Sequence, residues 1–279
     1  MTTMRPVEEQ TVLVTGATGG LGRALVHRLA ERGATVVAHG RSPEKLDGLV
    51  AEVEDSTGQR IHTVQADLSS LREVDRLADT VLERHPELTV LVNNAGIGFG
   101  EPGSGRELSR DGIELRFAVN HLASYHLARR LAERLQANAP ARIVQVASAG
   151  QVALDADDPL TEHGYDGVTA YRRSKLAQVM ATFDLAADLV GTGVSVNAVH
   201  PATFMDTTMV RDAGREPVST VEEGLDATWQ LVAGEELGEV SGCYFDGLHR
   251  GRPDPQADDP AARAWVRRLS DALISSSLG

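Results

Sequence analysis

The chain has 279 residues, of which 42% are apolar and 24% are charged, a composition typical of a globular protein that can bury a sizeable core. Its formal net charge of −13 leaves no basic surface for the phosphates of DNA or RNA, so a nucleic-acid partner is not expected. The only cysteine, Cys243, excludes an internal disulfide and a cysteine-rich metal site, and no bound metal is expected.

Apolar runs and cysteine usage bear on the location of the protein. The first ten residues, MTTMRPVEEQ, contain no apolar run, and a stretch of about 18 consecutive apolar residues occurs nowhere in the chain. A single cysteine suits a reducing compartment. The sequence therefore predicts a cytoplasmic protein without a membrane anchor or a membrane partner.

Short runs rich in β-branched residues alternate along the chain with segments of helical periodicity. The seven runs begin at Thr11, Thr35, Ile61, Thr89, Arg142, Val194 and Gly242. Strands that alternate with helices predict a parallel sheet covered by helices on both faces. Since no linker-like stretch divides the chain, residues 1–279 are expected to form one domain.

Local signals place two helix boundaries near the C-terminus. Ser219 with Glu222 fits a capping box and predicts the start of one helix. Asp259 followed by Pro260 predicts the start of the last one, a helical tail near 259–274.

Two long connections, 149–169 and 201–217, follow late strands of the predicted sheet. Open α/β sheets bind their ligands outside the carboxyl ends of the strands, where such connections lie. These two segments are therefore the candidate walls of a substrate site.

The stretch TVLVTGATGGLG, residues 11–22, joins the first predicted strand to the first predicted helix. Its glycines satisfy two spacings, T-G-x-x-x-G-x-G through Gly16, Gly20 and Gly22, and T-G-x-x-G-x-x-G through Gly16, Gly19 and Gly22. A glycine turn in this position lets a pyrophosphate approach the backbone at the N-terminus of the helix. The stretch predicts dinucleotide binding, and a plain tight turn is the alternative.

The end of the second strand, VVAHGRSPEKL, indicates which dinucleotide would bind. Gly40 stands where an acidic side chain would bond the adenosine ribose of NAD, and Arg41 and Ser42 follow. The guanidinium of Arg41 could pair with a 2′-phosphate, and Ser42 could donate a hydrogen bond to it. NADP(H) is therefore favoured over NAD(H), and an ordinary solvated arginine is the alternative.

The segment AYRRSKLAQ, residues 170–178, places Tyr171 and Lys175 on one face of a predicted helix. A nearby ammonium lowers the pKa of a phenol, which would make Tyr171 a usable proton donor or acceptor. A partly buried tyrosine beside a surface lysine is the alternative. Only two of the 27 basic residues are lysines, Lys45 and Lys175, so lysine at 175 indicates a specific requirement.

Taken together, T-G-x-x-x-G-x-G, NNAG at 93–96 and Tyr171-x-x-x-Lys175 resemble the short-chain dehydrogenase/reductase family, over about residues 10 to 250. The resemblance implies a doubly wound parallel sheet (Rossmann fold) of about seven strands. It selects the first glycine spacing, because the second marks a longer branch of the family. The long spacing from Ser148 to Tyr171 is similar to that of the retinol-dehydrogenase and protochlorophyllide-reductase-like branch, which implies a roomy site.

The resemblance implies residue roles. The catalytic set would be Asn120, Ser148, Tyr171 and Lys175. The expected cofactor-binding residues are Gly16, Thr18, Gly20, Leu21, Gly22, Arg41, Ser42, Asp67, Leu68, Asn94, Ala95, Gly96, Tyr171, Lys175, Pro201 and Thr203. Ala202 replaces a family glycine, and Thr207 or Thr208 lies slightly later than the threonine expected at the nicotinamide.

The implied reaction is hydride transfer between nicotinamide and the carbon of a carbonyl or secondary alcohol in a bulky small molecule. Tyr171 would protonate the developing alkoxide, and Ser148 would orient the carbonyl oxygen. Lys175 would lower the pKa of Tyr171 and hold the ribose, and Asn120 would hold a water that links Lys175 to solvent. The resemblance also implies a homodimer or homotetramer.

The sequence leaves two other functions open. The first is an NADP-binding sensor of the same fold without turnover, which the presence of both Tyr171 and Lys175 disfavours. The second is epimerase or dehydratase chemistry on a nucleotide sugar, which the short C-terminal region disfavours.

Overall fold

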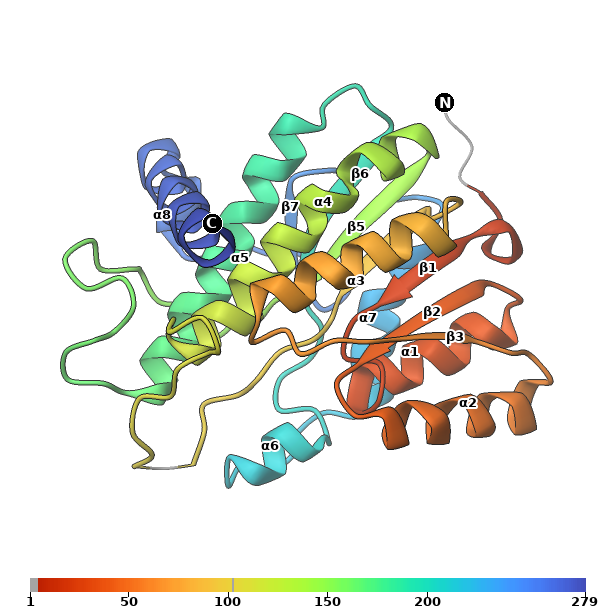
Figure 1. The fold of residues 1–279 in the computed structure, drawn as a ribbon, viewed down its shortest axis with the longest axis horizontal. Helices are drawn as coiled ribbons and strands as arrows, with labels where there is room; N and C mark the ends of the chain where they lie inside the picture. The colour runs from red at the N-terminus through yellow and green to blue at the C-terminus, as the bar shows by residue number, and fades with distance from the viewer. Residues whose placement is uncertain (1–4, 102) are drawn as a thin grey trace.

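The computed structural model describes residues 5–101 and 103–279, and this part of the chain contains one eight-stranded sheet (Figure 1). The strands are β1 (Thr11–Val14), β2 (Thr35–Gly40), β3 (His62–Gln65), β4 (Val90–Asn93), β5 (Ala141–Val146), β6 (Val194–His200), β7 (Cys243–Asp246) and β8 (His249–Arg250). Their spatial order is β3-β2-β1-β4-β5-β6-β7-β8. All neighbouring pairs are parallel except β7 and β8, which are antiparallel.

This sheet confirms the predicted doubly wound parallel architecture but adds one strand to the seven expected. The extra strand, β8, has only two residues and returns along β7 after a turn at Gly247, whose φ is 59°. Its residues, His249 and Arg250, are exposed and polar. The strands were predicted from runs of β-branched residues, and β8 contains no such residue.

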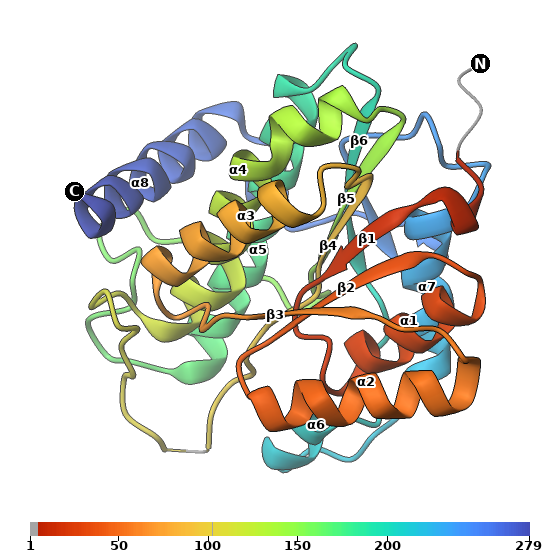
Figure 2. The ribbon, with the colours of Figure 1, turned by 45° about the vertical axis from the view of Figure 1, so that its right-hand side comes forward.

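Helices cover both faces of the sheet (Figures 1 and 2). The α-helices are α1 (Gly20–Glu31), α2 (Pro43–Thr57), α3 (Leu71–Arg84), α4 (Ala123–Ala137), α5 (Gly167–Asp188), α6 (Thr208–Asp212), α7 (Val221–Ala233) and α8 (Pro260–Leu278). The short helices are the 3₁₀ turns η1 (Val7–Glu9) and η3 (Pro255–Asp258) and the π-helical turn η2 (Phe117–Leu122). Helices α1, α2 and α7 pack on one face, α3, α4 and α5 on the other, and α8 lies outside α5 and α3.

The strand sequences explain this layering. Val12, Leu13 and Val14 of β1 are fully buried, and all six residues of β5 are buried. A parallel strand covered on both faces needs apolar side chains on both, so its sequence is nearly continuous in apolar residues rather than alternating. The core therefore has an apolar layer on each side of the sheet, and a third apolar cluster lies around η2, α5 and α8.

The start of α8 has the cap that the sequence predicts, whereas the cap of α7 uses neighbouring residues. Asp259 caps α8, because its Oδ1 accepts from the backbone N–H of Ala261 at 2.8 Å. The capping box of α7 uses Thr220 and Glu223, one residue later than the expected Ser219 and Glu222. The backbone of Ser219 instead pairs with the preceding connection, where its carbonyl accepts from the N–H of Asp206 at 3.0 Å.

We expect Leu131→Ala to lower the free energy of unfolding by about 2–5 kcal/mol, because the fully buried side chain leaves a cavity in the layer beneath α4. Val190→Ala is the control: Val190 is 79% exposed, and its truncation should change stability by no more than about 0.5 kcal/mol. Urea denaturation measures both, and equal effects would contradict the packing described.

Candidate functional site

A cavity of about 790 Å³ lies at the carboxyl end of the sheet and collects most of the predicted site residues. Those that line it are Gly16, Thr18, Gly20, Leu21, Arg41, Asp67, Leu68, Asn94, Ala95, Gly96, Ser148, Tyr171, Lys175, Pro201 and Thr203. Gly22, Ser42 and Asn120 are not part of the lining. The cavity lies where the strand order reverses between β1 and β4, the position at which open α/β sheets bind ligands.

The glycine turn between β1 and α1 forms one wall of the cavity. Its glycines differ in whether a residue with a side chain could take their place. Gly16 and Gly20 have positive φ, 64° and 50°. A Cβ at Gly22 would overlap the carbonyl oxygen of Gly16 and lie 2.5 Å from Nδ2 of Asn94. A Cβ at Gly19 would meet nothing within 4 Å. The steric demand for glycine therefore falls on Gly16, Gly20 and Gly22 rather than on Gly19.

Side chains from neighbouring strands hold this turn in place. Nδ2 of Asn94 donates to the carbonyls of Thr15 and Gly16 at 2.8 and 3.1 Å. His39, near the end of β2, accepts from the N–H of Gly16 at 3.3 Å, and its Nε2 lies 3.0 Å from the carbonyl oxygen of Ala66. Burial lowers the pKa of His39 to about 4, so the ring is neutral and can accept at Nδ1 while Nε2 donates. The sequence interpretation missed His39, although a histidine in a buried strand was a visible signal.

Basic side chains lie at the end of β2. Arg41 is exposed and forms no ion pair with another residue in the described ranges. Lys45 also lines the cavity, a position that the sequence interpretation did not assign. Ser42 instead caps α2, since its hydroxyl donates to Glu44 at 2.8 Å and accepts from the N–H of Lys45. Its expected hydrogen bond to a phosphate would compete with this cap.

Asp67 and Leu68 follow β3 at the same end of the cavity. Burial favours the neutral form of Asp67, but hydrogen bonds from Ser69 and the charges of Arg110 and Arg41 outweigh it and hold the pKa of Asp67 below its ordinary value. The carboxylate is therefore ionised beside the cavity.

Tyr171 and Ser148 meet on the opposite wall. Both side chains line the cavity there, and Oγ of Ser148 accepts from the N–H of Gly150 at 3.0 Å. Burial raises the pKa of Tyr171, and the Ser148 hydroxyl opposes this rise. The ring of Phe99 packs edge-on against that of Tyr171, with centroids 4.7 Å apart.

Lys175 lies on the same face of α5 as Tyr171. The expected lowering of the Tyr171 pKa by the Lys175 ammonium is not found. Nζ of Lys175 donates to the carbonyl of Val146 at 2.8 Å and to Oε1 of Gln178 at 3.1 Å, and lies 6.0 Å from the Tyr171 ring centroid. Burial lowers the pKa of Lys175 to about 7. The structure does not show the expected lowering of the Tyr171 pKa, because burial of the phenol dominates.

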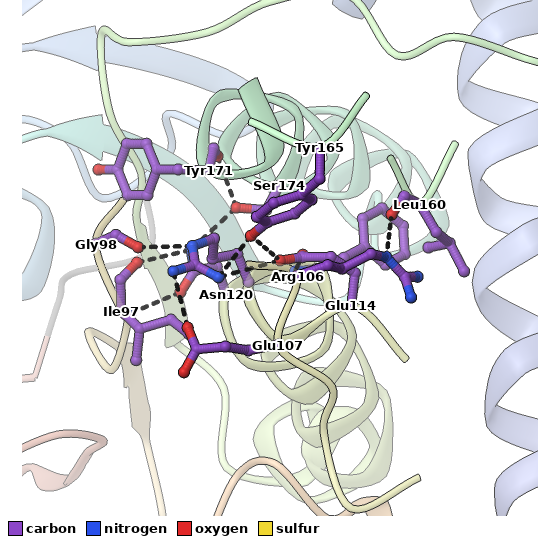
Figure 3. A network of polar contacts seen from close by, with 12 residues as sticks. Ile97, Gly98, Arg106, Glu107, Glu114, Asn120, Leu160, Tyr165, Tyr171 and Ser174 are labelled. Atoms are coloured by element: carbon purple, nitrogen blue, oxygen red, sulfur yellow. Dashed lines mark hydrogen bonds and ion pairs between the residues drawn. The ribbon is translucent and has the colours of Figure 1, made fainter. Parts of the chain in front are cut away.

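Asn120 belongs to the π-helical turn η2 and is fully buried. Nδ2 donates to the carbonyl of Ile97 at 3.1 Å and to the hydroxyl of Ser174 at 3.0 Å, and Oδ1 accepts from the N–H of Ile97 at 2.8 Å (Figure 3). Both amide hydrogens have protein partners, whereas the oxygen has one partner and a second lone pair. The side chain therefore ties the segment after β4 to α5, and its Oδ1 keeps one acceptor position for the expected water.

The apolar part of the cavity comes from one segment that the sequence interpretation did not single out and from one that it did. Residues after β4 form one side, and residues around α6, within the expected 201–217 wall, face them. The lining apolar side chains are Ile97, Phe99, Leu108, Leu115, Val119, Phe204, Met205, Met209, Val210 and Ala213. From the other expected wall, 149–169, Ala149 and Gly150 line the cavity. The length of the segment from 94 to 116, which lacks helical periodicity, was the signal available in the sequence.

In residues 5–101 and 103–279, no group of three or more His, Cys, Asp or Glu side chains could hold a metal ion. Among the same residues, no helix has the length and apolar character needed to cross a membrane.

Comparison with known proteins gives consistent matches. The family model for short chain dehydrogenases matches residues 10–217. Human retinol dehydrogenase 13 is 33% identical over 92% of this chain and 82% of that protein. The WW domain-containing oxidoreductase of Pongo abelii is 31% identical over 97% of this chain and 69% of that protein.

Solved structures share the fold. A crystal structure of an uncharacterised protein from Mycobacterium paratuberculosis superposes with a TM-score of 0.72 at 26% identity, covering 95% of this chain and 93% of that one. A protein from Beutenbergia cavernae, described as an NAD(P)-dependent gluconate 5-dehydrogenase, gives 0.67 at 29% identity, covering 85% and 94%. With the family match spanning both the glycine turn and the Tyr171–Lys175 helix, the chain belongs to the short-chain dehydrogenase family of oxidoreductases, and retinol dehydrogenases are among its relatives.

Proposed function

We propose that the protein is an NADP(H)-dependent oxidoreductase that acts on a carbonyl or secondary alcohol carbon in a bulky, apolar small molecule. The observation that carries the proposal is the meeting of Tyr171, Ser148 and Lys175 on one wall of a cavity whose other wall is the glycine turn. This arrangement would put a proton donor and a dinucleotide on either side of one substrate.

Gly40 and Gly96 line the cavity with backbone that carries no side chain, which would let a dinucleotide lie close to the chain. A Cβ at Gly40 would lie 2.8 Å from Thr18, and one at Gly96 would lie 3.2 Å from Oδ1 of Asn120. The N-terminus of α1 follows the glycine turn and favours a pyrophosphate. The similar protein from Beutenbergia cavernae was crystallised with bound NADP.

Arg41 and Lys45 support NADP(H) over NAD(H). Both line the cavity at the end of β2, and Gly40 supplies no carboxylate there to repel a phosphate. The guanidinium of Arg41 would pair with a 2′-phosphate through two parallel hydrogen bonds, and Lys45 would add a point charge.

The nicotinamide would supply or accept the hydride. In reduction, Tyr171 would give its phenolic proton to the substrate oxygen, and its raised pKa keeps that proton in place near neutral pH. Ser148, which lines the cavity with Tyr171, would donate a hydrogen bond to the same oxygen. Lys175 in its ammonium form would stabilise the phenolate left behind.

The apolar lining supports a bulky substrate. Phe99 and Leu115 on one side face a segment that contains Phe204 and Met209 on the other. Apolar walls of this extent favour a ligand with a large apolar body, and a few polar groups fix its orientation. The names of the relatives, retinol dehydrogenases, point to an alcohol with a large apolar body.

The single cysteine favours a reducing compartment such as the cytoplasm. We propose that residues 1–279 act as one dinucleotide-binding catalytic domain. Assembly as a homodimer or homotetramer is proposed from the family resemblance.

Tyr171→Phe is expected to lower kcat by about 10²- to 10⁴-fold with bulky ketones or aldehydes, because the proton donor is lost. The Kd for NADPH, measured by fluorescence titration, should stay within about twofold. Tyr125→Phe is the matched control, since Tyr125 bonds Asp271 outside the cavity. Wild-type rates in Tyr171→Phe would remove Tyr171 from its role, and tight NADPH binding without any turnover in the wild type would favour the sensor.

Arg41→Ala should weaken NADPH binding by roughly 1.5–3 kcal/mol, the contribution of a hydrogen bond to a charged group, with little change for NADH. Arg76→Ala, which removes an exposed arginine outside the cavity, is the control. Parallel titrations with both cofactors measure the difference. An equal loss for NADPH and NADH would refute the contact with a 2′-phosphate.

Gly22→Ala should abolish or strongly weaken binding of both cofactors, because the added Cβ overlaps the Gly16 carbonyl and displaces the turn. A Cβ at Gly19, on the same turn, would meet no protein atom within 4 Å, so Gly19→Ala keeps the turn intact and should bind NADPH far more tightly than Gly22→Ala does. Fluorescence titration of the folded variants distinguishes them. Equal behaviour of the two would show that the alternative glycine spacing is as good a description.

A further inference from the structure

A buried ion pair lies beneath the apolar wall of the cavity. Nη1 of Arg116 lies 3.3 Å from Oε1 of Glu114, and both side chains are 1% exposed. Removal of two charges from water costs several kcal/mol per ion unless hydrogen bonds satisfy them. The partners of this pair therefore indicate what it stabilises.

Arg116 bonds residues of two segments that are separate in the sequence. Its Nε donates to the carbonyl of Gly98 at 3.0 Å, and Nη2 pairs with Oε2 of Glu107 at 3.1 Å, both in the segment after β4. Nη1 donates to the hydroxyl of Tyr165 at 2.7 Å, just before α5. The guanidinium thus links the segment after β4 to the one that leads into the Tyr171 helix.

Tyr165 and Glu114 complete the network. The hydroxyl of Tyr165 donates to Oε1 of Glu114 at 3.0 Å, and Oε2 of Glu114 accepts from the N–H of Phe117 at 2.7 Å, at the start of η2. Burial and the charge of Glu114 raise the pKa of Tyr165, so its hydroxyl stays protonated and able to donate. The network is held in one arrangement by complementary donors and acceptors.

The backbone around Phe99 is enclosed on two sides. Gly100 has a φ of 81°, and a Cβ there would overlap Nη2 of Arg116. On the other side, a Cβ at Gly167, in the first turn of α5, would overlap the carbonyl oxygen of Phe99. With Gly98 bonded to Arg116 as well, this backbone has little freedom to move. The enclosed backbone keeps the Phe99 ring edge-on against Tyr171, with an interplanar angle of 86°.

We propose that Arg116 is a positioning residue of the substrate site, which acts through the backbone of Gly98 to hold Phe99 against Tyr171. Phe99 then defines how close the apolar body of a substrate can lie to the Tyr171 hydroxyl, and so selects among bulky carbonyl compounds. The selection rests on the proposed function, whereas the placement of Phe99 does not.

A plain structural tether is the alternative, and the chain offers a matched control for it. Nε of Arg106 donates to the carbonyl of Leu160 at 3.3 Å, and Nη2 pairs with Glu162 at 3.6 Å. Arg106 therefore also ties the segment after β4 to the one before α5, but it bonds neither Gly98 nor Phe99. If both arginines act only as tethers, Arg106→Lys and Arg116→Lys should have similar effects. If Arg116 positions Phe99, only Arg116→Lys should loosen the Phe99 ring.

The first measurement needs neither substrate nor cofactor. The chain has only four tyrosines, so ¹³C-labelled tyrosine gives few NMR signals, and Tyr171→Phe assigns one of them to Tyr171. Phe99→Leu removes the aromatic ring, and its effect on the Tyr171 signal calibrates the ring-current shift. Arg116→Lys keeps a charge beside Glu114 but loses the planar fork, and should move the Tyr171 signal in the same direction as Phe99→Leu. Arg106→Lys should leave it in place.

A Tyr171 signal that is unchanged in Arg116→Lys, or shifted equally in Arg106→Lys, would overturn the placement of Phe99 by Arg116. If Arg116→Lys does not fold, Tyr165→Phe replaces it. That variant removes one hydroxyl from the network and should cause a smaller shift in the same direction. No shift in folded Tyr165→Phe would equally overturn the proposal.

The second measurement tests selection through a double-mutant cycle. Arg116→Lys should raise KM for a bulky ketone by about tenfold, as expected for a misplaced positioning group, and leave the Kd for NADPH unchanged. In a Phe99→Leu background it should have little further effect, because both changes act on the same contact. Additive effects would refute action through Phe99. If the wild type shows no turnover while the NMR shift is found, the proposed function fails and the placement of Phe99 stands.

Discussion

The close approach of two backbone turns at the carboxyl end of the sheet is the constraint on which the site depends. β1 and β4 are neighbours where the strand order reverses, so the turns that follow them meet. Gly22 fits only because it lacks a Cβ, and the amide of Asn94 bonds the carbonyls of Thr15 and Gly16. This approach leaves the cavity open between the glycine turn and α5, and the remaining walls are arranged around it.

Burial controls the charges in this cavity and acts in opposite directions on acids and bases. It lowers the pKa of Lys175 to about 7 and that of His39 to about 4, and it raises the pKa of Tyr171. The common cause is the loss of water around the charged form. Each group is consequently closer to neutrality than in water, and the ammonium form of Lys175 depends on the Val146 carbonyl and Gln178 that it bonds. In the proposed reaction, protons would therefore move between groups whose pKa values are shifted by burial.

Residues in the same site differed in how well the sequence predicted them. Tyr171 and Lys175 were predictable because a spacing of four residues on one helix fixes their common face. The cap that the Ser42 hydroxyl forms on α2 and its bond to Glu44 were not part of the prediction. The contacts of Arg116 with Gly98, Glu107 and Tyr165 join segments up to 67 residues apart, and nothing in their local sequence marks them as partners. The apolar wall after β4 was missed for the same reason.

The sequence by itself determined the alternation of strands and helices, the glycine turn and the helical pair, because each depends on residues within a few positions of one another. It also carried the family resemblance, which the family match confirms. Only the tertiary structure decided the eighth strand, the partners of Asn120, the direction of the Tyr171 pKa and the setting of Phe99 against Tyr171. These properties depend on burial and on contacts through space between distant segments, and burial is fixed only when the whole chain has packed.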